Sequence, residues 1–120
     1  MRFTFGLVLV AASILPAAAS HAADAAHGKA LFATCGECHL DPLGEKAPSL
    51  DGVVGRKAGS TDFAYSSAMK SSGITWTPDR LQAFLQNPTA VVPGTKMGFG
   101  GTDSASDAAD IVAYLQTLKS

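Results

Sequence analysis

Five consecutive residues concentrate the chemistry of this 120-residue chain. Cys35 and Cys38 are two thiols three positions apart, and His39 follows directly. The C-x-x-C-H arrangement is typical of c-type haem attachment, because the two thiols can reach the two vinyl groups of one porphyrin. The following imidazole then lies beneath the iron, so His39 is the candidate proximal ligand. The sequence therefore predicts one covalently attached haem c, bound through Cys35 and Cys38.

Other interpretations of the same residues stay open. The two cysteines could form a structural disulfide, or a thioredoxin-like dithiol, although the dithiol requires a strand–helix context that this chain lacks. A zinc site would need a second pair of ligands, and outside the motif the chain after residue 22 offers only one further His or Cys, His27. Haem attachment is the interpretation we prefer.

The ligand at the sixth coordination position of the haem iron decides whether such a protein is an electron carrier or an enzyme. Met69 is expected to fill the core, the usual role of methionine. Met97 lies in a loop without helical period, far enough along the chain to reach the opposite haem face. A thioether ligand raises the reduction potential, and with both axial positions filled oxygen or peroxide finds no open site. We expect electron transfer and no enzymatic activity; the alternative is a haem enzyme or ligand sensor with a labile sixth position.

Composition indicates one small compact domain. The chain is 47% apolar and 16% charged, which excludes a disordered protein. Nine Lys and Arg residues stand against ten Asp and Glu residues. This balance excludes a nucleic-acid partner that binds through a strongly basic face.

The first residues resemble an export signal. Arg2 precedes the apolar run 3–14, and Ser20-His21-Ala22 has the small-x-small pattern of a cleavage site. We therefore predict a signal peptide over residues 1–22 and a single domain over residues 23–120, located in the periplasm. The run is short for a bilayer span of roughly 20 residues, and an uncleaved anchor is the alternative. After cleavage we expect no stable membrane insertion.

Helix signals follow, without any alternating strand pattern. Asp24, Thr77 and Ser104 are candidate N-caps. The expected helices run from Asp24 to about Cys35, over residues 66–72, from Pro78 to the residue before Pro88, and from about Ser104 towards the C-terminus. Residues 36–59 and 91–102 are expected to be loops. The predicted fold is all-α, with short helices and long loops around a haem that supplements a modest core.

At nine places the chain resembles class I cytochromes c, the family of mitochondrial cytochrome c and its soluble bacterial relatives. These are Gly28 with Phe32, Cys35-x-x-Cys38-His39, Pro48-Ser49-Leu50-x-Gly52, Gly55-Arg56-Lys57-x-Gly59, Phe63-x-Tyr65-Ser66, Gly73-Ile74-Thr75-Trp76, Asn87-Pro88, Pro93-Gly94-Thr95-Lys96-Met97-x-Phe99, and Asp110-x-x-Ala113-Tyr114-Leu115. They cover nearly all of the region after residue 22.

The resemblance implies roles for these positions. Pro48 would accept a hydrogen bond from the imidazole of His39, and Thr95 would bond near the haem propionates. The inner propionate would be held by Arg56, Tyr65 and Trp76. The haem crevice would be lined by Leu50, Leu85 and Phe99. Gly28 and Phe32 would meet Ile111 and Tyr114 where the first and last helices cross.

The chain also departs from the mitochondrial pattern. Phe84 stands where that family has a tyrosine beside the methionine ligand, and Met69 replaces an asparagine of the haem pocket. Of the lysines that surround the haem edge there, little remains beyond Lys96.

The resemblance implies redox partners, while the missing lysines limit how they dock. The donor would be a quinol-oxidising complex or a periplasmic dehydrogenase, and the acceptor a terminal oxidase or a reaction centre. The protein itself would be a monomer. Because the basic ring is missing, we expect docking to depend weakly on salt and to use apolar contacts from Val91, Val92 and Gly98.

Overall fold

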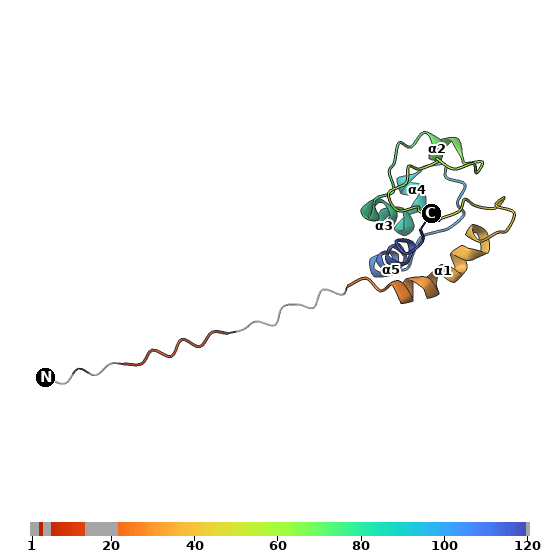
Figure 1. The fold of residues 1–120 in the computed structure, drawn as a ribbon. Coiled ribbons are helices and arrows are strands. Elements are labelled where there is room, and N and C mark those ends of the chain that lie inside the picture. Colours follow the sequence, from red (N-terminus) through yellow and green to blue (C-terminus); the bar gives the residue numbers. More distant parts are fainter. Residues whose placement is uncertain (1–2, 4–5, 14–21, 120) are drawn as a thin grey trace.

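The computed structural model describes residue 3, residues 6–13 and residues 22–119. This part of the chain contains five helices and no strand: α1 (Ala25–His39), α2 (Ser67–Lys70), α3 (Pro78–Gln86), α4 (Pro88–Val91) and α5 (Ala105–Leu115). The predicted all-α fold with long loops is confirmed (Figure 1). No helix among the described residues is both long and apolar enough to span a bilayer. Most of the predicted cleavage region, residues 14–21, lies outside the described residues.

Side-chain caps fix where the longer helices begin. The carboxylate of Asp24 accepts from the backbone N–H groups of Ala26 and His27, at 3.0 and 3.2 Å. The Thr77 hydroxyl oxygen accepts a hydrogen bond from Arg80 N at 3.3 Å. The Ser104 hydroxyl oxygen accepts one from Asp107 N at 3.1 Å. Each bond satisfies an N–H group that has no partner within the helix. The three N-caps expected from the sequence are confirmed.

Three helix boundaries differ from the sequence-based expectation. The helix expected over residues 66–72 is shorter, since α2 covers only Ser67–Lys70. Helix α1 does not stop near Cys35 but continues through His39, and it ends where Leu40 N donates to Gly36 O at 3.0 Å. Glycine weakens a helix without forbidding it, so the C-x-x-C-H motif forms the last turn rather than a loop. Pro88, expected only to end α3, also begins α4, because a first-turn residue needs no N–H donor.

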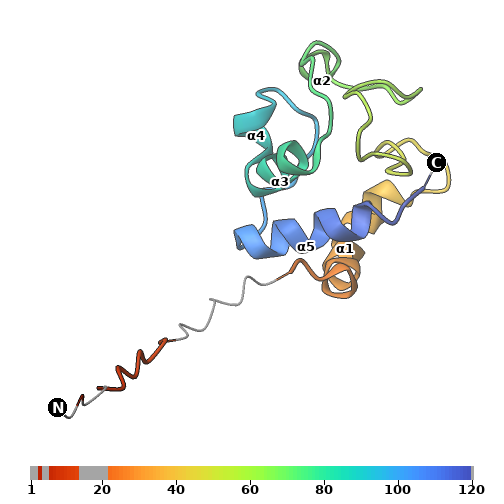
Figure 2. The same cartoon turned by 60° about the vertical axis from the view of Figure 1, so that its left-hand side comes forward.

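Helix α5 crosses α1 at close range, as both views of the ribbon indicate (Figures 1 and 2). Gly28 makes this approach possible, because a Cβ there would overlap the backbone carbonyl of Asp110. One turn further along α1, the Phe32 ring packs against Tyr114 with 5.1 Å between centroids. The meeting of the first and last helices predicted from the resemblance is therefore confirmed.

Backbone hydrogen bonds order the long loop between α1 and α2. Gly55 N donates to Trp76 O at 2.7 Å, and Trp76 N donates to Arg56 O at 2.9 Å. Gly52 N donates to the carbonyl of Leu118, close to the C-terminus, at 2.8 Å. The loop is thus fastened to two distant segments, and these contacts fix the residues that face the interior.

Candidate functional site

A cavity lies between α1, α3, α5 and the long loops. Its open space, with the solvent at the mouth included, is about 1150 Å³. Most of the wall is apolar, with Phe32 from α1, Leu81 and Leu85 from α3, and Ile111 from α5. None of the described Asp or Glu residues lines it. A mostly apolar ligand fits such a wall better than a polar substrate does.

The last turn of α1 presents the C-x-x-C-H motif to this cavity. Positions i, i+3 and i+4 of a helix share a face, so Cys35, Cys38 and His39 all line the same wall. Cys35 is half-buried, and Cys38 is exposed at the mouth. Both are free thiols. Burial raises the pKa of the Cys35 thiol, with only partial compensation from a backbone hydrogen bond.

The imidazole of His39 is held in one orientation by the loop that follows α1. Its Nδ1 atom lies 2.7 Å from the carbonyl oxygen of Pro48. A carbonyl can only accept, so Nδ1 carries the proton and Nε2 keeps a lone pair for a metal. Burial lowers the pKa of His39, the Pro48 carbonyl raises it, and nearby Arg56 lowers it again. The net lowering favours the neutral imidazole that metals bind.

Two methionines line the cavity. Met97 belongs to the loop after α4, where its backbone N–H donates to Thr95 Oγ1 at 3.2 Å. Met69 comes from the short helix α2 and is also only partly buried. The structure therefore brings both thioethers to the chamber. Met69 also packs against the hydrophobic core, as its sequence pattern suggested.

Three of the polar residues assigned to a propionate line the cavity together. The guanidinium of Arg56 donates to the backbone carbonyls of Ser49 and Asp51, each at 2.9 Å. The Tyr65 hydroxyl shares a 2.6 Å hydrogen bond with Thr61 Oγ1. Trp76 is buried, and its ring stacks at an angle on Phe84 with 5.0 Å between centroids. All three side chains are thus held in fixed positions on the chamber wall.

The other predicted residues divide between two cavities. Pro48, Leu50, Leu85 and Thr95 line the large chamber, as does Lys46, to which no sequence signal gave a role. Phe99 does not line it. The Phe99 side chain instead faces a smaller neighbouring space, which it shares with Cys35 and Asp107.

The fit of these residues to a haem can be tested on the chamber itself. Its wall is mostly apolar, and two thiols with helical i, i+3 spacing lie on one side of it. The fixed imidazole beside them offers a neutral nitrogen, and thioether sulfurs are present in the same chamber. Imidazole and thioether are the donor set of haem electron carriers. The residues fit a covalently bound haem.

Comparisons with known proteins lead in the same direction. The family model described as "Cytochrome c" matches residues 25–119. A cytochrome c of Tetrahymena pyriformis is 48% identical over 97 residues, covering 79% of this chain and 89% of the relative. A cytochrome c2 of Blastochloris viridis is 42% identical over 119 residues, covering 96% and 91%. The solved structure of cytochrome cH from Methylobacterium extorquens superposes with a TM-score of 0.72 at 44% identity, covering 78% of this chain and 98% of that one.

Proposed function

Because the chain belongs to the cytochrome c family, whose members are electron carriers with covalently attached haem c, we propose that it is a periplasmic single-electron carrier with His39 and Met97 as its axial ligands. The bound haem supplies a one-electron Fe(II)/Fe(III) couple. The observation that most supports the proposal is one apolar chamber on which both thiols, an imidazole fixed by Pro48 and the Met97 side chain converge.

The cysteines and His39 act as one unit in this proposal. Cys35 and Cys38 hold the cofactor by thioether bonds, so its position is tied to the last turn of α1. His39 gives its Nε2 lone pair to the iron while Nδ1–H stays bonded to Pro48. That outer hydrogen bond fixes the ring and makes the imidazole a stronger donor.

Met97 is proposed as the sixth ligand in preference to Met69. Met97 lies in a loop whose backbone is shaped by the Thr95 hydroxyl, whereas Met69 is part of α2. In the family pattern the ligand methionine follows Pro-Gly-Thr-Lys, which this chain has at residues 93–96. A filled sixth position leaves electron transfer through the cofactor edge as the remaining chemistry.

Arg56, Tyr65, Trp76 and Thr95 are proposed to face the propionates. The carbonyl contacts of Arg56 use part of its five-donor fork and leave the rest for a carboxylate. A positive guanidinium inside the chamber also offsets the charge of a buried propionate. Phe99, which faces the smaller cavity, is proposed to cover the Cys35 side of the cofactor.

Export and partners complete the proposal. Residues 1–22 are proposed as a cleaved signal peptide, since α1 begins with Asp24 as its N-cap, directly after the predicted cut. The mature domain, residues 23–120, would act as a monomer between a quinol-oxidising complex or dehydrogenase and a terminal oxidase or reaction centre.

One preparation tests the proposal. The mature protein is isolated from the periplasm, its mass is measured, and the visible spectrum of the oxidised form is recorded. We expect the mass of residues 23–120 plus one haem, and the weak charge-transfer band near the infrared edge that a Met–Fe(III) bond gives. Absence of the band would refute Met97 ligation. A mass that includes residues 1–22 would refute cleavage.

A further inference from the structure

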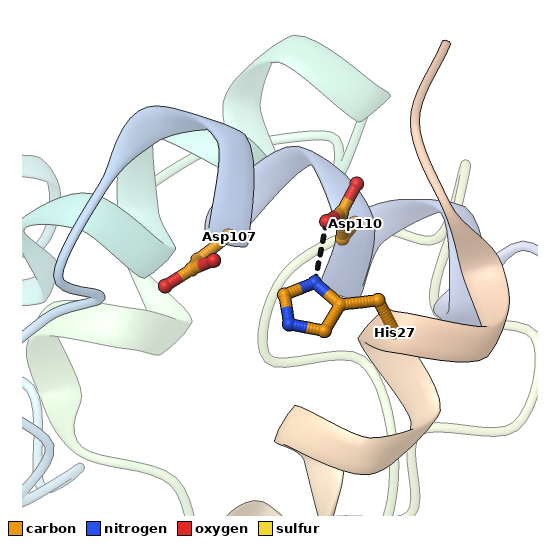
Figure 3. A group of neighbouring side chains, drawn as sticks. All are labelled: His27, Asp107 and Asp110. Atoms are coloured by element: carbon orange, nitrogen blue, oxygen red, sulfur yellow. Dashed lines mark hydrogen bonds and ion pairs between the residues drawn. The ribbon is translucent and has the colours of Figure 1, made fainter. Parts of the chain in front are cut away.

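His27 takes part in a side-chain group outside the haem chamber. It projects from the first turn of α1 towards Asp110 of α5, and Asp107 of the same helix lies to one side of the ring (Figure 3). One ligand atom from each of the three residues lies within 4.8 Å of the others. The Nδ1 atom of His27 is 2.7 Å from Asp110 Oδ2.

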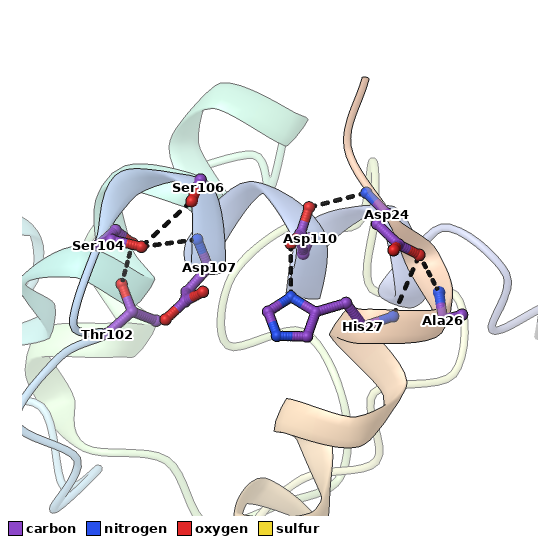
Figure 4. Close-up of polar contacts among 8 residues, drawn as sticks. All are labelled: Asp24, Ala26, His27, Thr102, Ser104, Ser106, Asp107 and Asp110. Atoms are coloured by element: carbon purple, nitrogen blue, oxygen red, sulfur yellow. Dashed lines mark hydrogen bonds and ion pairs between the residues drawn. The ribbon is translucent and has the colours of Figure 1, made fainter. Parts of the chain in front are cut away.

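The group contains two carboxylates and one imidazole. Among the described residues, His27–Asp110 is the only ion pair. The charge of the half-buried Asp107 acts on the same imidazole, and the Asp107 backbone N–H donates to Ser104 Oγ at 3.1 Å (Figure 4). The Asp24 carboxylate is also close enough to act on the imidazole. Two carboxylates thus converge on one imidazole, with a third nearby.

The backbone that carries these ligands is rigid. Asp107 and Asp110 are spaced i, i+3 on α5, so they share a face. Gly28, next to His27, touches the carbonyl of Asp110, and Asp24 N donates to Asp110 Oδ1 at 2.7 Å. The helices cannot separate or slide here without losing these contacts. The backbone positions of the three ligands are therefore fixed by tertiary structure, while their side chains can still rotate.

We propose that His27, Asp107 and Asp110 form a binding site for a divalent transition-metal cation of the zinc type. One imidazole with two carboxylates suits Zn²⁺ better than Ca²⁺ or Mg²⁺, which prefer oxygen ligands only. The cation replaces the proton that Nδ1 shares with Asp110 Oδ2, and this proton passes to solvent. With bonds of about 2.0–2.2 Å the N···O separation opens from 2.7 Å to about 3.3 Å, which side-chain rotation provides.

The site does not depend on the haem chemistry proposed above, since none of its three residues lines the large chamber. A bound cation would join α1 to α5 across their crossing. It would raise the stability of the folded state by mass action, because the unfolded chain lacks the site.

Zinc titration of the haem-loaded protein tests the proposal. Isothermal calorimetry with ZnCl₂, after treatment with a chelator, should show one site per chain. His27→Gln keeps a hydrogen-bonding group towards Asp110 but removes the nitrogen ligand, and Asp107→Asn keeps the size of the side chain without its charge. Each should weaken zinc binding at least tenfold. Asp103→Asn is the matched control, since Asp103 precedes α5 but lies outside the group.

The outcomes are distinct. Binding should be stronger at pH about 8 than at about 5, because zinc and a proton compete for the same nitrogen. Zinc should raise the melting temperature of the wild type and of Asp103→Asn, but not of the other two variants. A wild type without a zinc site, or His27→Gln binding as tightly as the wild type, would overturn the proposal. An unchanged visible spectrum during titration would show that zinc does not act at the haem ligands.

Discussion

The carbonyl of Pro48 lies 2.7 Å from Nδ1 of His39, nine residues earlier in the chain. This contact determines which imidazole nitrogen faces the chamber, since the protonated one is engaged with the loop. It depends on the loop conformation, which Arg56 maintains by donating to Ser49 O and Asp51 O at 2.9 Å. The geometry of a residue in α1 is thus set by a segment that begins after the helix has ended.

Covalent attachment predicts that the haem survives denaturation. Thioether bonds through Cys35 and Cys38 do not break when the fold is lost, whereas a cofactor held only by ligation dissociates. Acid acetone should therefore leave the porphyrin with the protein in the wild type. The Cys35→Ser, Cys38→Ser double variant should release any haem that it binds. Extraction from the wild type would contradict the central assignment.

The two methionines predict different phenotypes. Met97→Ala should give a five-coordinate or water-ligated haem without the charge-transfer band, whereas Met69→Leu should keep it. Axial ligands set haem potentials over about 0.8 V, and we expect Met97→Ala to lower the potential by at least roughly a tenth of that range. Redox titration with optical detection measures both effects. If Met69→Leu loses the band and Met97→Ala keeps it, the ligand assignment must be reversed.

The helix crossing predicts an unusual response to alanine. Gly→Ala within a helix normally stabilises by up to about 1 kcal/mol. At Gly28 the new Cβ would overlap the carbonyl of Asp110, so Gly28→Ala should instead lower the free energy of unfolding by about 1–3 kcal/mol. Urea denaturation of the haem-loaded protein measures it. Lys29→Ala, at the exposed neighbouring position, is the control and should change stability by less than about 0.5 kcal/mol.

The ion pair at the same crossing predicts a pH dependence. The hydrogen bond to Asp110 raises the pKa of His27, desolvation opposes it, and the charges of Asp110, Asp107 and Asp24 add to the increase. The folded-state pKa lies above the unfolded value of about 6.5, so the stabilisation is complete below that value. It is lost as the pH rises through the raised folded pKa.

Urea denaturation of the wild type and His27→Gln, with a chelator present, measures this contribution. The difference in unfolding free energy should be largest near pH 5 and should shrink towards pH 8. Because the two proteins share every other titrating group, the difference isolates His27. A difference that grows with pH would contradict the sign argued here.

Partner docking is predicted to depend weakly on salt. The whole chain carries a formal net charge of −1, and the chamber is lined by the basic residues Lys46, Arg56 and Lys96, whose charge the propionates of a bound haem would offset. We expect electron transfer with the physiological partner to slow less than tenfold between about 0.01 M and 0.15 M salt. Stopped-flow kinetics measures the rate, and a steeper loss would show that a basic docking face dominates.

The apolar part of that docking surface needs a correction. Val92 is 1% exposed, so it belongs to the core and cannot contact a partner as expected from the sequence. Leu40 and Leu43, in the loop after α1, are 69% and 77% exposed. They offer apolar area near the C-x-x-C-H turn that no pattern in the sequence distinguished from buried leucines.

The sequence correctly predicted the features that depend on neighbouring residues alone. Caps such as Asp24 and Thr77 act within three residues, and the spacing of Cys35, Cys38 and His39 is itself a chemical signature. The position of Gly28 at the crossing with the last helix came from resemblance, because a close helix approach leaves no local trace. The continuation of α1 through Gly36 was missed, since tertiary packing overrides a weak propensity.

The sequence also did not predict the group around His27, because contacts between distant helices leave no local sequence pattern. Asp107 and Asp110 are ordinary acidic residues of a terminal helix when considered alone. They become neighbours of His27 only because two helices about eighty residues apart in the chain cross at a glycine.

The hydrogen bond from Gly52 N to Leu118 O connects the C-terminal segment to the loop that orients His39. The loop that presents Pro48 is fastened at that point to the segment after α5. Proteolytic trimming that removes Leu118 would remove one of the two attachments of this loop and would weaken the support of the His39 orientation. A purification tag is best attached beyond this residue through a flexible spacer, because a rigid fusion could break the hydrogen bond between Gly52 and Leu118 that supports the loop.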